Sequence, residues 1–310
     1  MQSRIVTGLA LLVFFASETE ALLATQERLE AASVETLTGE LDGGTGGISV
    51  DRDGNIYVAD FGSRLSGGGT VGSKVFVVSP YGETRIFAEG FRGASGNEFD
   101  SEGNFFQSNV SASVISKVAP DGEVTTFASE GIATPVGIVS DEEDNLYVAN
   151  CGSNSIQKVT PEGASERFVG SGLLNCPNGI VFDDHGNLYV ANFGNGGVIK
   201  ITPDKQVSEI ATLPGNNNGH LIHHDGFLYV IDRGGHQVYS VSLNGEVELF
   251  AGSGSRGRQD GDPLEATFSY PNDIGISPDG KTLYVNEVAG DAGPHTVLAP
   301  MVVRAIRVRD

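Results

Sequence analysis

One pattern recurs along the whole chain and restricts its fold more than any other feature. A short apolar strand with an aromatic residue near its start appears six times, each time just after a turn rich in Gly, Asn or Asp. The aromatic residues are Tyr57, Phe106, Tyr147, Tyr189, Tyr229 and Tyr284, separated by 49, 41, 42, 40 and 55 residues. Repeats of this length predict a ring of stacked sheets, because a single small sheet cannot bury both of its faces.

The clearest copy of the repeat covers residues 178–211. Its apolar runs are only four to six residues long, and each is closed by Asp, Gly, Asn or Pro. Short runs closed by such turn-forming residues predict four antiparallel strands joined by tight connections. Gly and Asn before the aromatic residue supply the positive φ that a tight hairpin requires. One copy of the repeat is therefore one propeller blade.

The last copy lacks a strand, and the N-terminal region supplies a matching one. The third strand of blade 6, residues 302–308, ends almost at the C-terminus. Residues 34–39 have the pattern of the fourth strand of blade 5, so we expect them to form the outer strand of blade 6. The predicted fold is an all-β, six-bladed β-propeller of four-stranded antiparallel blades, with its ring closed by this N-terminal strand. We assign residues 34–310 to this single domain.

The composition limits the kinds of partner. Nineteen Lys and Arg against forty Asp and Glu give a net charge of −21, without a clustered basic patch. Phosphate backbones would be repelled, so we expect no nucleic-acid partner. A cation or a small neutral molecule suits this charge better, and the long loops described below could also bind a protein or a glycan.

The first residues resemble an export signal. A basic start is followed by a short apolar stretch at residues 5–16, and Thr19-Glu20-Ala21 fits a cleavage site. We therefore predict a signal peptide at residues 1–21, a linker at 22–33 and a secreted or periplasmic protein, the alternative being an ordinary N-terminal helix. The apolar stretch is too short to span a bilayer, so we expect no membrane span in the mature chain.

Cys151 and Cys176 are the only cysteines. In the predicted propeller both lie at the same end of neighbouring blades. A disulfide is one interpretation, which an oxidising compartment would allow, and two unreactive thiols are the other.

Three insertions interrupt the repeat, at residues 62–73, 252–270 and 288–300. All of them fall at one end of the predicted ring, where second strands end and first strands begin. Long loops gathered on one face are typical of a working surface. We refer to this face as the mouth.

A ring of polar residues closes the second strands at the mouth. The positions are Asp60, Asn109, Asn150, Asn192, Asp232 and Glu287. Their oxygens could bind a ligand, with Asp232 and Glu287 as the candidate catalytic acid or base. The alternative is structural, because Asp and Asn often accept hydrogen bonds from the backbone amides of a turn.

His220 is the third candidate catalytic residue. It stands two residues beyond Asn218, where four of the other blades carry Ile and one carries Asn97. A histidine near the mouth could act as a general base or a ligand. It could equally be a hydrogen-bonded residue packed between blades.

Two segments carry a family resemblance. The sequences Gly-Ser-Gly-Ser-Arg-Gly at 252–257 and Tyr-Pro-Asn-Asp-Ile-Gly-Ile at 270–276 resemble NHL-repeat propellers. Gly-Asn-Leu-Tyr-Val-Ala-Asn at 186–192 is similar to the superfamily of senescence marker protein and gluconolactonases.

The gluconolactonase resemblance implies a divalent cation, usually calcium, at the mouth, held by acidic and Asn residues. Asn178 matches the ligand pattern of those enzymes, whereas Gly46, Val136 and Asn218 depart from it. Other oxygen ligands could come from the polar ring. The metal-binding candidates are Asn178, Asn192, Asn150, Asp232 and Asp60.

Three functions follow as hypotheses. The first is a hydrolase of a lactone or similar small ester, in which a cation polarises the carbonyl and Asp232 or Glu287 helps to deliver water. The second is a non-catalytic exported propeller that binds a protein or glycan. The third is a lyase resembling the streptogramin-cleaving propellers, with His220 or Glu287 as base.

Overall fold

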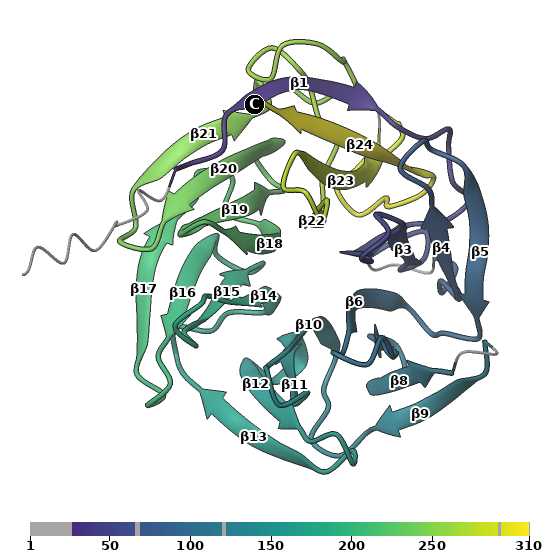
Figure 1. Ribbon diagram of the computed structural model, residues 1–310, viewed down its shortest axis with the longest axis vertical. Coiled ribbons are helices and arrows are strands. Elements are labelled where there is room, and N and C mark those ends of the chain that lie inside the picture. The colour runs from purple at the N-terminus through teal and green to yellow at the C-terminus, as the bar shows by residue number, and fades with distance from the viewer. Residues whose placement is uncertain (1–26, 66–68, 120–121, 291–292, 310) are drawn as a thin grey trace, which may run out of the picture.

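The computed structural model describes residues 27–65, 69–119, 122–290 and 293–309. The strands form six separate four-stranded antiparallel sheets arranged around a central axis, as Figure 1 shows. This confirms the predicted six-bladed propeller. The signal peptide expected at residues 1–21 lies outside the described residues.

Each of the first five blades uses four consecutive strands, from the innermost to the outermost. Blade 1 comprises β2 (Thr45–Val50), β3 (Ile56–Asp60), β4 (Lys74–Val78) and β5 (Thr84–Glu89). Blade 2 comprises β6 (Ala94–Phe99), β7 (Phe105–Asn109), β8 (Val114–Val118) and β9 (Val124–Ala128). Blade 3 comprises β10 (Pro135–Ser140), β11 (Leu146–Asn150), β12 (Ser155–Val159) and β13 (Ser165–Gly170). Blade 4 comprises β14 (Pro177–Phe182), β15 (Leu188–Asn192), β16 (Gly197–Ile201) and β17 (Val207–Thr212). Blade 5 comprises β18 (Asn218–His224), β19 (Phe227–Asp232), β20 (Gln237–Ser242) and β21 (Val247–Ala251).

Blade 6 joins the two ends of the chain. It contains β22 (Ile274–Ile276), β23 (Thr282–Val288), β24 (Met301–Val308) and, on its outer edge, β1 (Ala31–Thr36). The N-terminal strand therefore closes the ring as predicted, although it begins and ends three residues earlier than the expected range 34–39. Val34 pairs with Ile306 and is 1% exposed, so β1 adds to the core as well as covering the edge of β24.

The residues just before β1 also pack on the propeller. The backbone N–H of Leu29 donates to the Tyr229 hydroxyl at 2.7 Å, and Arg28 forms an ion pair with Glu248. Part of the segment assigned to a linker is thus attached to blade 5. The reason is that Leu29 and Ala31 lie against the apolar cluster between blades 5 and 6.

The hairpins between first and second strands follow the predicted turn chemistry. In blade 1, the Asp51 carboxylate accepts the backbone N–H groups of Asp53 and Asn55 at 2.9 and 2.8 Å, and Gly54 has a φ of 84°. Asp100, Asp141 and Asp183 make the corresponding bonds in blades 2, 3 and 4. The turn is specified locally in these four copies.

The core consists of apolar clusters between neighbouring blades. Between blades 3 and 4, the Tyr147 ring makes edge contacts with Phe168 and Phe182, each at a centroid distance of 5.0 Å. The repeated aromatic residue thus fills the interface between two sheets, which is why it recurs in every blade.

The mouth carries the three insertions, and they contact one another. Leu298 N–H donates to the Ser63 carbonyl at 3.1 Å, which joins the loops of blades 1 and 6. Arg256 donates to the Gly293 carbonyl at 2.6 Å, which joins the loop between blades 5 and 6 to the same segment. The predicted gathering of long loops on one face is confirmed.

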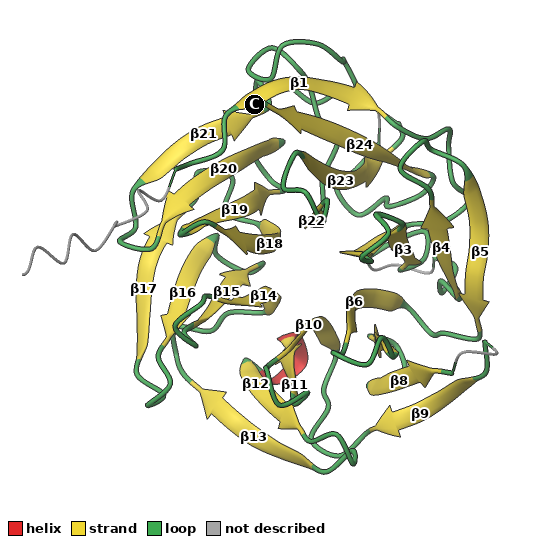
Figure 2. Cartoon of the chain, viewed as in Figure 1, coloured by secondary structure: helices red, strands yellow, loops and turns green. Residues whose placement is uncertain are grey.

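A disulfide links blades 3 and 4 at the mouth. Cys151 begins the short 3-10 helix η1 (Cys151–Ser153), coloured red in Figure 2, and is bonded to Cys176, which directly precedes β14. Of the two interpretations of these cysteines, the bonded one is correct. Among the described residues, no helix has the length and apolarity needed to cross a membrane.

Candidate functional site

The polar ring at the ends of the second strands serves the backbone. All six side chains accept an N–H group from the connection that leads into the first strand of their own blade. The six bonds are Asp60 to Gly44 (2.8 Å), Asn109 to Arg92 (2.9 Å), Asn150 to Ala133 (3.1 Å), Asn192 to Asn175 (3.1 Å), Asp232 to Gly215 (2.9 Å) and Glu287 to Ser269 (2.5 Å). These contacts support the structural alternative for this ring, because a buried amide needs a partner.

The five candidate metal ligands each take part in hydrogen bonds of the fold. Asp60, Asn150, Asn192 and Asp232 each bond within their own blade, and the Asn178 side-chain amide donates to the Asn218 carbonyl at 3.1 Å. Over the described ranges, no group of three or more His, Cys, Asp or Glu residues could hold a metal ion. Calcium prefers several oxygens, including carboxylates, so the residues present do not fit it.

Asp232 and Glu287, the candidate catalytic acids, are each engaged in the fold. Asp232 also accepts the N–H of Gly235 at 3.1 Å, and burial raises the pKa of this carboxyl while the two amides oppose the rise. The Glu287 carboxylate is fully buried and forms an ion pair with Arg304, which is also paired with Asp260. Each oxygen of both carboxylates therefore has a hydrogen-bond or ion-pair partner.

The innermost strands of neighbouring blades touch through glycine. Five blades carry Gly at the same position of the first strand. These residues are Gly47, Gly96, Gly137, Gly179 and Gly219. A side chain at Gly137 would lie 2.2 Å from the Asn178 carbonyl oxygen, and one at Gly219 would lie 2.1 Å from that of Asn272. Close approach of the backbones therefore excludes any larger residue there.

Blade 6 carries Asp273 at this position in place of Gly. Its buried carboxylate joins three elements around the axis of the ring. Oδ2 accepts the N–H of Ile48 from blade 1 at 2.8 Å and lies 3.0 Å from Nδ1 of His220 on β18, while Oδ1 accepts the N–H of Ile274. An acid in place of Gly at this position was not singled out from the sequence, although alignment of the six copies contains the signal.

His220 is held by Asp273 in one orientation. The ring is 5% exposed, and Nδ1 faces the carboxylate. Nε2 is buried and has no hydrogen-bond partner among the described residues. A histidine whose Nδ1 donates to a carboxylate presents Nε2 as the basic nitrogen. His220 is thus a hydrogen-bonded residue packed between blades, and its role as a general base stays a prediction.

Glu98 adds a third ionisable group on an innermost strand, β6 of blade 2. Burial raises the pKa of its carboxyl to about 8, the backbone N–H of Phe99 opposes the rise, and the negative charge of Asp273 adds to it. The electrostatic influence of Asp273 reaches this strand across the axis. Glu98 is therefore mostly protonated at neutral pH.

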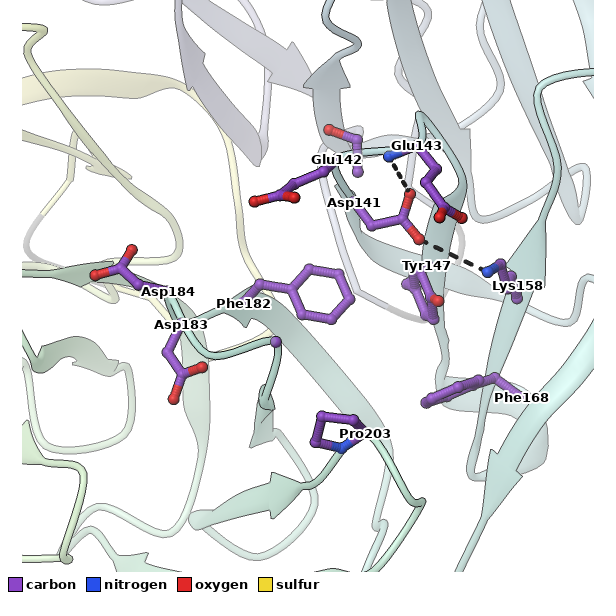
Figure 3. A pocket seen from close by; sticks show the side chains of 12 residues that line it. Asp141, Glu142, Glu143, Tyr147, Lys158, Phe168, Phe182, Asp183, Asp184 and Pro203 are labelled. Atoms are coloured by element: carbon purple, nitrogen blue, oxygen red, sulfur yellow. Dashed lines mark hydrogen bonds and ion pairs between the residues drawn. The ribbon is translucent and has the colours of Figure 1, made fainter.

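A groove near the surface lies at the other end of the ring from the mouth. Figure 3 shows a groove of about 560 Å³ between blades 3 and 4, lined by Asp141, Tyr147, Lys158, Phe168 and Phe182. It is formed by the hairpins opposite the mouth, and a similar groove of about 500 Å³ lies between the corresponding hairpins of blades 1 and 2. Since the repeat itself generates such grooves, we do not take this cavity as the functional site.

The comparison with solved structures agrees with this architecture. Virginiamycin B lyase from Staphylococcus aureus is similar over 88% of this chain and 99% of its own, with a TM-score of 0.63 and 14% identity. A gluconolactonase from Xanthomonas campestris is similar over 89% of both chains, with a TM-score of 0.66 and 14% identity. An auxiliary nutrient binding protein from Bacteroides ovatus is similar over 91% of this chain and 78% of its own, with a TM-score of 0.68 and 15% identity.

These likenesses establish a shared fold. No protein-family model matches the sequence, and no curated protein is similar to it in sequence. The resemblance to gluconolactonase-like and streptogramin-lyase-like propellers is therefore confirmed at the level of the six-bladed architecture. At 14% to 15% identity the activity has to be argued from the residues.

Proposed function

We propose that this protein is an enzyme that opens a small cyclic ester or lactone, with His220 as the general base and Asp273 as the residue that positions it. The observation that carries the proposal is the 3.0 Å contact between Nδ1 of His220 and Oδ2 of Asp273, with Nε2 left unpaired. A buried nitrogen without a partner is costly, so water or a ligand atom is expected to supply one in the working protein.

The repeat strengthens this choice. The other blades carry Gly where Asp273 stands, and four of them carry Ile where His220 stands. In a repeat protein, departures that bury ionisable groups against the local rule are typical of functional sites. Asp232 and Glu287 accept backbone N–H groups as Asp60 and Asn192 do in other blades, and the remaining oxygen of Glu287 is paired with Arg304.

The structural neighbours support small-molecule chemistry of this kind. They include a gluconolactonase and a virginiamycin B lyase, and one neighbour is a catalytically inactive variant of that lyase, with a histidine replaced by alanine, bound to quinupristin. A base at Nε2 could activate water for hydrolysis or remove a carbon-bound proton for elimination. The divalent cation implied by the resemblance has no fitting ligand set here, so no step is assigned to it.

The test is turnover of a panel of lactones and cyclic esters by the full chain, followed by proton release and mass spectrometry. Hydrolysis adds one water to the product, whereas ring opening by elimination leaves the mass unchanged. We expect His220→Gln to reduce turnover by roughly 10²- to 10⁴-fold. His223→Gln is a matched control on the same strand, and equal losses in both variants would contradict the proposal.

A binding protein without catalysis is the second candidate, because the nutrient binding protein is among the neighbours and the loops at the mouth are long. It predicts that ligands bind to the native protein and are recovered unchanged.

A further inference from the structure

Arg233 is buried in an unusual way. It follows directly after β19 at the mouth and is only 2% exposed. Among the described residues its hydrogen-bond partner is the His295 carbonyl, 3.2 Å from Nη2, and its Nε, like that of Arg304, is buried without a partner there. Within the described part of the chain, no carboxylate lies within ion-pair distance of this guanidinium. Burying an unpaired charge destabilises a fold, so this arrangement calls for an explanation.

Arg304 shows what a compensated arginine looks like in the same protein. Its side chain is fully buried like that of Arg233, but it pairs with both Glu287 and Asp260 and donates to the carbonyls of Thr267 and Gln259. The fold is thus able to supply carboxylates to a buried guanidinium. It supplies none to Arg233 over the described residues, although the chain has forty acidic residues.

The surroundings of Arg233 favour an anion. Its guanidinium carbon lies 4.9 Å from the centre of the Tyr270 ring, and that of Arg256 lies 4.4 Å from the same ring. Burial lowers the pKa of Arg233 to about 10, and the charge of Arg256 contributes in the same direction. Burial and the two arginines lower the pKa of the neighbouring His236 to about 4. Two guanidinium groups therefore lie against the same tyrosine ring.

The position of Arg233 also breaks the repeat. Blades 1, 2 and 4 carry the apolar residues Phe61, Val110 and Phe193 at the equivalent place. Arg233 follows Asp232, which pairs with Asn218 across β18 and β19, so it lies at the mouth end of the blade that also carries His220. Tyr270 and Arg256 are partly exposed and separate it from solvent.

We propose that Arg233 binds the carboxylate or phosphate group of a small ligand at the mouth, between blades 5 and 6. A guanidinium offers a planar pair of donors that matches either anion. The bound anion would provide the negative charge that Arg233 lacks among the described residues. Tyr270 holds the guanidinium from one side through its ring. This binding site does not depend on the proposed catalysis, because it can be measured without turnover.

The experiment is a titration of the full chain with sodium acetate and with inorganic phosphate, against sodium chloride at equal ionic strength. We expect a saturable rise in melting temperature and a binding signal in calorimetry for at least one of the two anions. The stronger response tells a carboxylate ligand from a phosphate ligand. No saturable response to either anion would overturn the proposal.

Arg233→Met provides the decisive comparison. Without added anion we expect this variant to melt at the same temperature as the wild type or higher, because it removes an uncompensated buried charge. We expect its affinity for the anion to fall by at least about 10-fold. Arg85→Met, on the exposed outer strand of blade 1, is the control and should retain anion binding.

A less stable Arg233→Met protein that still binds the anion would show that Arg233 is only structural. Should Arg233→Met not fold, Arg233→Lys replaces it, with weakened anion binding supporting the proposal and unchanged binding overturning it.

Discussion

The Nδ1 atom of His220 lies 3.0 Å from Oδ2 of Asp273, and this contact joins blades 5 and 6. The same carboxylate oxygen accepts the Ile48 N–H of blade 1. One acid therefore connects three successive blades and also orients a histidine. Because Asp273 has two roles, a substitution can affect stability and activity to different extents.

Asp273→Asn tests that separation. The amide keeps an acceptor for Ile48 N–H, so we expect a loss of only about 1 to 3 kcal/mol in the free energy of unfolding. It cannot hold the His220 ring as a carboxylate does, so turnover should fall by roughly 10²-fold or more. Denaturant unfolding and steady-state kinetics measure the two quantities. A stability loss with full activity would remove Asp273 from the catalytic unit.

Glu287→Gln tests whether this acid is catalytic or structural. Removing one partner of its buried pair with Arg304 should cost about 3 to 5 kcal/mol of stability. Activity per folded molecule should persist, because the Glu287 oxygens are bonded to Arg304 and to the Ser269 N–H. Activity is compared at a temperature where both proteins are folded. A stable but inactive variant would restore Glu287 as a catalytic acid.

Glu98 predicts a pH dependence of stability. Its pKa in the folded protein is about 8, against about 4.3 for an unfolded glutamate. Between these values the native state retains a proton that the unfolded state releases, so the free energy of unfolding falls as pH rises. We expect Glu98→Gln to reduce this fall, measured by melting at about pH 5 and about pH 8. Glu102→Gln, at an exposed hairpin, should leave it unchanged.

Closure of the ring depends on Val34. This residue is 1% exposed in β1, whereas Ala32 on the same strand is exposed. Val34→Asp should destabilise the protein by roughly 3 kcal/mol or more, because a carboxylate would be buried without a partner. Ala32→Asp should have little effect. Thermal unfolding measures both, and similar results would show that β1 contributes little to the closed ring.

The gluconolactonase resemblance implies calcium dependence, whereas the contacts of the candidate ligands lead us to predict none. Since the oxygens of Asp60, Asn150, Asn192 and Asp232 already accept backbone N–H groups, we expect neither EDTA nor added calcium to shift the melting temperature. A saturable upward shift with calcium would show that ligands outside these contacts bind it, and would return a metal-assisted mechanism to consideration.

Local signals were sufficient to predict the architecture. A hairpin such as Asp51 to Asn55 is specified by residues that bond to one another within the turn. Tyr189 lies in a short strand whose neighbouring side chains point to the other face of the sheet. The number of repeats then predicted the number of blades. Even the closing strand was recognisable, but its register was wrong by three residues, because Val34 is 1% exposed whereas Val247, with which it was matched, is 41% exposed.

The chemistry at the mouth could not be predicted in the same way. Whether an acid is free or engaged depends on partners that lie far away in the chain, such as Arg304 for Glu287 and the Gly215 N–H for Asp232. The sequence by itself determined the six blades, their turns and the face that carries the loops, because those features arise from contacts between near neighbours. Only the tertiary structure brought Asp273 to His220 and left Arg233 without a carboxylate among the described residues, because burial and charge pairing are set by the packing of one blade against the next.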